Sequence, residues 1–167
     1  SSGQRDLLQR FHDFTEALRV FPKPVIAAVE GQAVGTGFAL ALACDLVVAA
    51  EDARFTLHDG EDGLAALGGA GWQLAHRLPR ALALQMLWLP QPEPAARLHA
   101  WGLVNWLTPT GQALTRALAV AEALATAPVD AVARVKDRVN QWPQLGVSEE
   151  SLSVHGDLYD DALRSAY

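Results

Sequence analysis

The chain has 167 residues, of which 50% are hydrophobic and 19% charged, so it can bury a core as one globular domain. Its formal net charge is −6 and its only lysines are Lys23 and Lys136, which argues against a nucleic-acid-binding or anionic-membrane-binding surface. A single cysteine, Cys44, excludes a disulfide framework or a thiolate metal site within the chain and suits a reducing cytoplasm, where we expect the protein. No apolar run approaches the ~20 residues that span a bilayer, so we expect no membrane segment.

In the first 50 residues, segments with a helical pattern alternate with segments with a strand pattern. Apolar residues recur at three- and four-residue spacing from Leu7 to Phe21, which predicts a helix with one apolar face, ended by the prolines that follow. The stretch VIAAVE at residues 25–30 predicts a short strand covered on both faces. A helix of small residues ending near Cys44 precedes a second predicted strand at residues 45–50.

The rest of the chain is predicted to be mainly helical. Residues 58–71 are rich in glycine and acidic residues and have no clear period, which predicts a loop over a site. A strand is predicted at residues 103–109, and the predicted helices cover residues 72–78, 80–89, 94–101, 111–126, 128–141 and 148–166.

Two glycines, Gly35 and Gly37, flank Thr36 where the small-residue helix begins. Glycines allow a ligand to approach the backbone closely, and the first N–H groups of a helix have no acceptor within it. Such a turn can form half of an oxyanion hole; alternatively, the glycines only permit a tight turn and close helix packing. Leu40 stands where the dinucleotide-binding pattern G-x-G-x-x-G needs its third glycine, so that kind of site is not expected.

The sequence from Lys23 to Asn140 resembles the crotonase family, the enoyl-CoA hydratases and isomerases. The resemblance rests on KPVIAAVEGQAVGTGFALALACDLVVAAEDARFTL and on the later stretches GLAALGGAG, RALALQML, AWGLVN and APVDAVARVKDRVN. It implies an α/β fold of the crotonase-like β-β-α superhelix type, with a partial core at 1–109 and a C-terminal helical trimerisation region at 110–167. It also implies a homotrimer or dimer of trimers that acts on an acyl-CoA substrate and needs no separate cofactor, since CoA is part of the substrate.

The resemblance assigns roles to the glycine turn and to the acidic loop. In the family, a backbone N–H of the turn binds the thioester oxygen, and that position falls on Thr36, between Gly35 and Gly37. The two catalytic glutamates of family hydratases correspond to Ala39 and Asp59. Because alanine cannot move a proton, this departure favours isomerase-type proton transfer over hydration. Asp59 is then the expected acid/base, and Glu61 its substitute; hydrolase or decarboxylase chemistry stays open.

The resemblance covers only part of the family pattern. The N-terminal β-β-α turns, which supply the second oxyanion donor and much of the CoA contact, would lie before Ser1, and the usual last helix stops early at Tyr167. We expect either a fragment of a longer protein or a truncated homologue. The alternative function is therefore a non-catalytic, crotonase-like subunit with a structural role in an assembly.

Other side chains with chemical potential fit ordinary structural roles better. The histidines lack metal-ligand spacing, so no metal site is expected. Ser153, His155 and Asp157 lie two residues apart in a predicted helix, where they do not face one another as a triad must. The five tryptophans are expected in core or interface packing.

Overall fold

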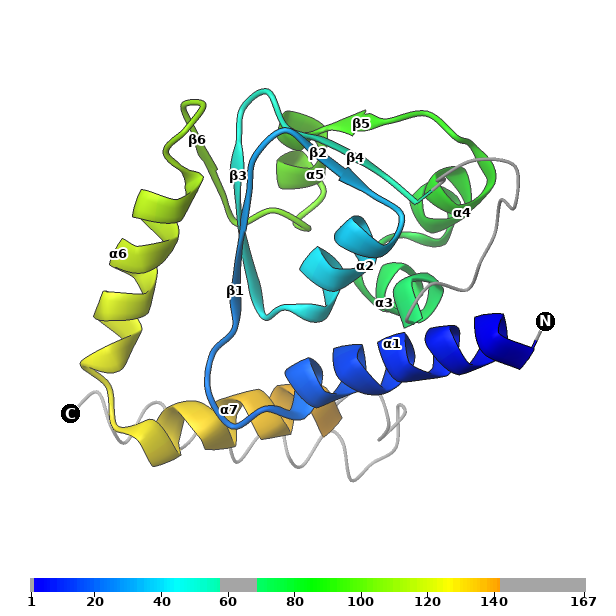
Figure 1. Ribbon diagram of the computed structural model, residues 1–167. Coiled ribbons are helices and arrows are strands. Elements are labelled where there is room, and N and C mark those ends of the chain that lie inside the picture. Colours follow the sequence, from blue (N-terminus) through cyan, green and yellow to red (C-terminus); the bar gives the residue numbers. More distant parts are fainter. Residues whose placement is uncertain (1, 58–68, 142–167) are drawn as a thin grey trace.

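A computed structural model describes residues 2–57 and 69–141 of the chain, and two small three-stranded sheets lie at its centre (Figure 1). The first sheet is parallel with the order β1-β3-β6, formed by β1 (Ile26–Val29), β3 (Leu46–Ala50) and β6 (Trp106–Thr108). The second has the order β2-β4-β5, with β2 (Gln32–Val34) parallel to β4 (Arg54–Thr56) and β5 (Glu93–Pro94) antiparallel to it. Both β1–β2 and β3–β4 place one strand in each sheet before the next helix, which confirms the expected β-β-α repeat.

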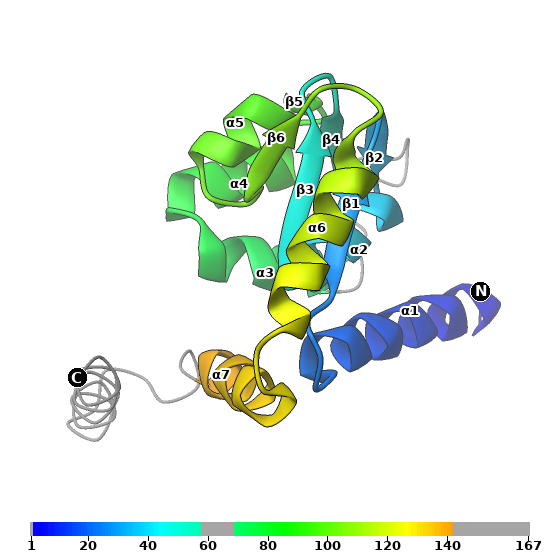
Figure 2. The same ribbon diagram turned by 90° about the vertical axis from the view of Figure 1, so that its left-hand side faces the viewer.

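Helices cover both sides of these sheets (Figures 1 and 2). They are α1 (Ser2–Val20), α2 (Thr36–Ala43), α3 (Ala70–Arg77), α4 (Arg80–Trp88), α5 (Ala95–Ala100), α6 (Ala113–Ala125) and α7 (Val129–Gln141). Helix α6 packs on β1 and β3, α2 contacts β2, α1 and α3, and α7 lies beside α1. The first helix of the region predicted for trimerisation thus covers the sheet, while the division at residue 109 and the trimerisation role stay predictions.

The core lies between the sheets and helices α2 to α5. Its largest fully buried side chains include Phe38 and Leu42 from α2, Phe55 from β4 and Leu74 from α3. The rings of Phe38 and Phe55 meet edge to face, with their centroids 5.2 Å apart. Helix α2 has no charged side chain and buries five of its eight residues, so burial rather than an amphipathic pattern explains its composition.

Within the described residues, the predicted elements with clear periodicity are confirmed, with shifts at their ends. The helix predicted at residues 148–166 lies outside the described residues. The loop predicted at residues 58–71 is wrong at its end, because α3 begins at Ala70. The helix predicted from Pro94 begins one residue later, because Pro94 is part of β5. Strands β2, β4 and β5 are two or three residues long, too short to show an alternating pattern.

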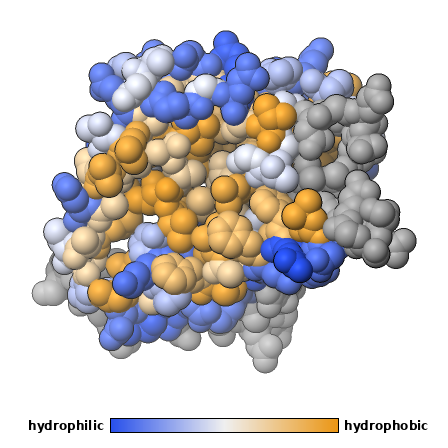
Figure 3. All heavy atoms as spheres, in the orientation of Figure 1, coloured by the Kyte–Doolittle hydropathy of each residue, from blue (hydrophilic) through white to orange (hydrophobic). Residues whose placement is uncertain are grey.

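The expected apolar faces are less covered than predicted. Leu7, Phe14 and Phe21 are 68%, 52% and 47% exposed, and strand β1 is only partly buried. Figure 3 shows apolar side chains gathered over β1, α2 and α6 on the face seen in Figure 1. Contiguous exposed apolar surface is typical of a face against which further protein packs.

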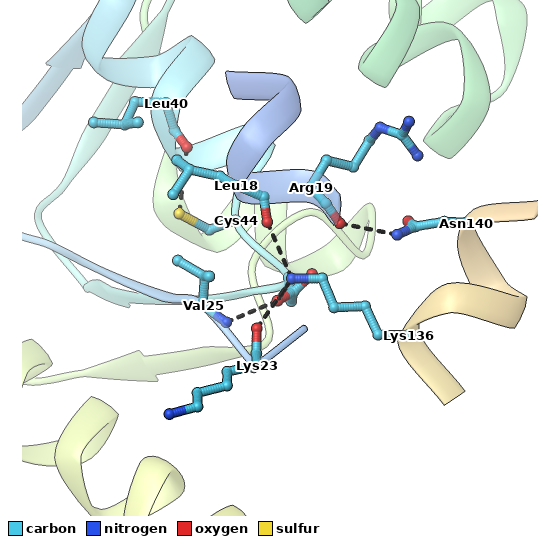
Figure 4. Close-up of polar contacts among 9 residues, drawn as sticks. Leu18, Arg19, Lys23, Val25, Leu40, Cys44, Lys136 and Asn140 are labelled. Atoms are coloured by element: carbon cyan, nitrogen blue, oxygen red, sulfur yellow. Dashed lines mark hydrogen bonds and ion pairs between the residues drawn. The ribbon is translucent and has the colours of Figure 1, made fainter. Parts of the chain in front are cut away.

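Lys136 on α7 ties together three separate parts of the chain, and its side chain is only 10% exposed (Figure 4). Its ammonium group donates to the carbonyls of Leu18 and Lys23, at 3.0 and 3.1 Å, and to the Asp45 carboxylate at 2.7 Å. The same Asp45 oxygen accepts the Val25 N–H at 2.7 Å. Lys136 is therefore engaged in contacts within the protein, and these contacts join α7 to the end of α1 and to the residues that follow α2.

Candidate functional site

The start of helix α2 lies at the carboxyl ends of two paired strands. Strands β2 and β4 run parallel, with Val34 opposite Thr56, and the Gly35 N–H donates to the Thr56 carbonyl at 2.8 Å. This bond holds the glycine turn against the end of β4. In α/β proteins, ligands bind beyond the carboxyl ends of parallel strands, so this turn is the candidate functional site.

The backbone of Gly35 requires glycine. Its φ of 55° and ψ of −114° lie where side-chain-bearing residues are strained, and the residue is buried. Its carbonyl accepts the first helical bond, from the Ala39 N–H at 3.0 Å. The N–H groups of residues 36–38 therefore have no acceptor within α2, and no side chain of the N-cap residue binds them.

Thr36 and Gly37, which carry two of these N–H groups, are exposed residues, whereas Phe38 is buried. A Cβ built at Gly37 meets nothing within 4 Å, and close packing within the chain therefore does not explain the glycine at that position. A tight turn accounts for Gly35, and packing within the described residues does not account for Gly37. The positive end of the α2 dipole adds to the attraction of this turn for a negatively charged oxygen.

Helix α2 contributes no acid or base at this end. Its first turn contains no acidic residue, and Ala39, one turn beyond Thr36, is buried with 1% exposure. The predicted acid/base residues Asp59 and Glu61 lie outside the described residues. The structure thus brings together Gly35, Thr36 and Gly37, while the roles of Asp59 and Glu61 stay predictions.

At the opposite end of α2, the one potentially reactive side chain of the helix terminus, Cys44, is buried. Cys44 is buried, and its thiol lies 3.4 Å from the Leu40 carbonyl (Figure 4). Burial, and then the nearby Asp45 carboxylate, raises the pKa of the Cys44 thiol above its ordinary value of 9.0. A buried thiol that resists ionisation is a poor nucleophile, so Cys44 has the properties of a packing residue.

The described residues contain no group of three or more metal-binding side chains and no helix long and apolar enough to cross a membrane. His76 and His99 each contact a backbone carbonyl at 2.8 Å, through their Nδ1 atoms. Trp72 and Trp88 are 42% and 66% exposed, so neither is a core residue of this chain.

Sequence reasoning missed the contacts that hold the site in place. The Thr56 carbonyl anchors the glycine turn, but strand β4 was not predicted because it is only three residues long. Glu30 was also missed: its carboxylate accepts the N–H groups of Gly111 and Ala113, at 3.0 and 2.9 Å, and so binds the start of α6. No local pattern points to this pairing across some 80 residues of sequence.

The pattern of the enoyl-CoA hydratase/isomerase family matches residues 2–164. The chain is 32% identical over 127 residues to carnitinyl-CoA dehydratase of Proteus mirabilis, covering 76% of this chain and 49% of that protein. It is 33% identical over 138 residues to mevalonyl-coenzyme A hydratase of Aspergillus fumigatus, covering 82% of this chain and 51% of that protein. The chain spans about half the length of these curated relatives.

The fold is also found among solved structures. An enoyl-CoA hydratase from Polaromonas sp. JS666 superposes with a TM-score of 0.85 at 40% sequence identity. The match covers 97% of this chain and 63% of that one.

Proposed function

Because the chain belongs to the enoyl-CoA hydratase/isomerase family, we propose that it acts on an acyl-CoA thioester at the N-terminus of α2. One observation carries this proposal: the N–H of the exposed residue Thr36 has no acceptor within α2 and stands at a glycine turn, next to a glycine that the packing of the described residues does not require. The turn is held rigidly by the bond from Gly35 to Thr56.

In the proposed reaction, the Thr36 N–H donates to the thioester oxygen of the substrate. When a base removes a proton from the α- or γ-carbon, the electron pair moves into the thioester and leaves an enolate with negative charge on that oxygen. A donor already in position stabilises this charge without reorganising, and one such donor is typically worth ~2.7–4 kcal/mol. Return of the proton to the other carbon completes a double-bond shift.

We propose proton transfer rather than hydration as the principal chemistry. The named relatives are hydratases and a dehydratase, whose reactions add or remove water. Hydration requires one group to activate water and another to protonate carbon, and the buried Ala39 can serve as neither. A single carboxylate can take a proton and return it; an ordinary aspartate side chain is a base at neutral pH, and Asp59 would be that base, with Glu61 as its substitute.

Solvent exchange tests this proposal. The native protein, in whatever length it occurs, is incubated with an enoyl-CoA in deuterated water, and deuterium at the α- and γ-carbons is followed by NMR or mass spectrometry. We expect exchange to be much faster than water addition. Asp59→Asn should abolish exchange while acyl-CoA binding persists, whereas Glu61→Gln should retain it. If Asp59→Asn exchanges as fast as the parent, Asp59 is not the base.

A complex with an acyl-CoA analogue tests the oxyanion donor separately. The thioester oxygen is expected within hydrogen-bond distance of the Thr36 N–H. A thioester bound elsewhere would remove this role from the glycine turn.

The second candidate function is a non-catalytic subunit that stabilises an assembly, and it is favoured by Ala39 and by the exposed apolar face. Both candidates predict a homotrimer or dimer of trimers, which sedimentation at micromolar concentration would detect; a monomer would contradict this. An oligomer that shows no exchange with any enoyl-CoA would favour the second candidate. We also propose that the protein is cytoplasmic and that its reaction needs no cofactor apart from the CoA of the substrate.

A further inference from the structure

A cleft of about 200 Å³ lies at the end of α2 opposite to the glycine turn. It is formed by α1, α3, α7 and the residues that follow α2, and its lining includes Arg19, Asp45, Trp72, Gln73 and Arg77. Eight helical residues, about 12 Å, separate the two ends of α2, so the cleft is distinct from the proposed acyl-CoA site.

The Gln73 side chain gives the first indication of a ligand. Gln73 is 6% exposed and lines the cleft, yet no hydrogen bond joins its amide to any residue that the structure describes. An amide offers two donors and one acceptor, and buried polar groups of native proteins nearly always have partners. The amide therefore has the capacity to bind a group that enters the cleft.

The charges around the cleft leave one net positive charge, because the Asp45 carboxylate interacts with both Lys136 and Arg77. Arg19 forms an ion pair with Glu16 at 2.9 Å and lies over the Trp72 ring, and Asp45 forms an ion pair with Lys136 at 2.7 Å. The charges of Arg19 and Glu16 cancel each other, and so do the charges of Asp45 and Lys136.

Arg77 forms no ion pair within the described part of the chain. Arg77 is an exposed residue, so a ligand can reach it. Burial of its guanidinium by nearby protein atoms lowers the pKa of the group, and the nearby Asp45 carboxylate opposes this shift. The remaining wall includes the His76 ring, whose centroid lies 4.0 Å from that of the Trp72 ring, and the His76 Nδ1 contacts the Trp72 carbonyl at 2.8 Å.

We propose that this cleft binds a small molecule with a carboxylate or phosphate group, which Arg77 pairs with and to which the Gln73 amide donates. A guanidinium presents paired donors that match the oxygens of such an anion. The volume suits a compact ligand rather than a nucleotide. The Asp45 carboxylate does not prevent binding, because the two cations that interact with it, Lys136 and Arg77, outweigh its single negative charge.

Thermal unfolding at constant ionic strength tests the proposal, with inorganic phosphate and acetate as separate probes and chloride as the reference. In the parent protein, we expect phosphate, acetate or both to raise the unfolding temperature in a saturable manner. The probe with the tighter binding identifies the class of anion. No saturable rise with either probe, up to tens of millimolar, would overturn the proposal.

Three variants show whether the anion binds in the cleft. Arg77→Gln removes the cation, and Gln73→Leu removes the unpartnered amide with little change in volume; each should weaken binding at least tenfold. Arg80→Gln removes an exposed arginine just outside the cleft and should leave binding unchanged. Circular dichroism checks that each variant is folded. If Arg77→Gln does not fold, Gln73→Leu still tests the proposal. Parent-like affinity in a folded Arg77→Gln or Gln73→Leu would place the anion elsewhere.

Discussion

Helices α2 and α6 both begin without a capping side chain on their N-cap residues, Gly35 and Gln112. At α6, the carboxylate of the distant Glu30 takes the place of a cap and accepts two backbone N–H groups. At α2, no side chain in the described residues does so, although the turn itself is held firmly by the Thr56 carbonyl. The chain can therefore satisfy one helix start with a distant carboxylate, at α6, while it leaves the donors at the start of α2 without a side-chain acceptor.

The largest effect is expected from Gly35→Ala, which forces a side chain into a backbone conformation that favours glycine. We expect the free energy of unfolding to fall by about 2 kcal/mol. Proton exchange with enoyl-CoA should also be lost, since the strain displaces the Thr36 N–H. Urea denaturation measures the first effect, and parent-like stability would show that this turn is not rigid.

Removing the carboxylate at the other helix should affect stability alone. Glu30→Ala leaves two N–H groups at the start of α6 without their acceptor, which should cost about 1 kcal/mol. Exchange activity at α2 should not change. Glu51→Ala, which removes an exposed carboxylate after β3, is the matched control; equal losses in the two variants would argue against a capping role for Glu30.

Gly37→Ala at the start of α2 should change acyl-CoA affinity and folding stability in opposite directions. The added methyl group meets open space in this chain, and alanine restricts the unfolded chain more than glycine does, so stability should rise by about 0.5 kcal/mol. Acyl-CoA binding, measured by calorimetry, should nevertheless weaken by about tenfold, because the methyl group occupies the space assigned to the ligand. Unchanged affinity would mean that the substrate does not approach this residue.

The smallest effect is expected at the closed end of α2, from the pH dependence of stability. The folded protein keeps the Cys44 proton at pH values where the unfolded chain loses it, because the folded pKa is raised above 9.0. Stability should therefore fall as the pH rises through 9.0, by at most about 0.4 kcal/mol at that pH. Denaturation of Cys44→Ala across this range should lack this contribution, and an identical pH profile would contradict the assignment.

Elements with a local pattern could be predicted from the sequence. Strands β1 and β3 of the first sheet and helix α6 carry apolar runs or periodic spacing within themselves, so their predicted positions were nearly right. The strands of the second sheet could not be predicted, because two or three residues carry no period. The exposure of Phe14 could not be predicted either, since spacing identifies an apolar face but not what covers it.

The same division applies to the candidate site. The sequence by itself determined the glycines around Thr36, the alanine at position 39 and the family resemblance, because each depends on residues close together in the chain. Only the tertiary structure decided that Thr56 holds the turn, that Glu30 binds the start of α6 and that Gln73 faces a cleft without a partner. These features arise from contacts between residues far apart in the sequence, which exist only when packing brings the sheets and helices together.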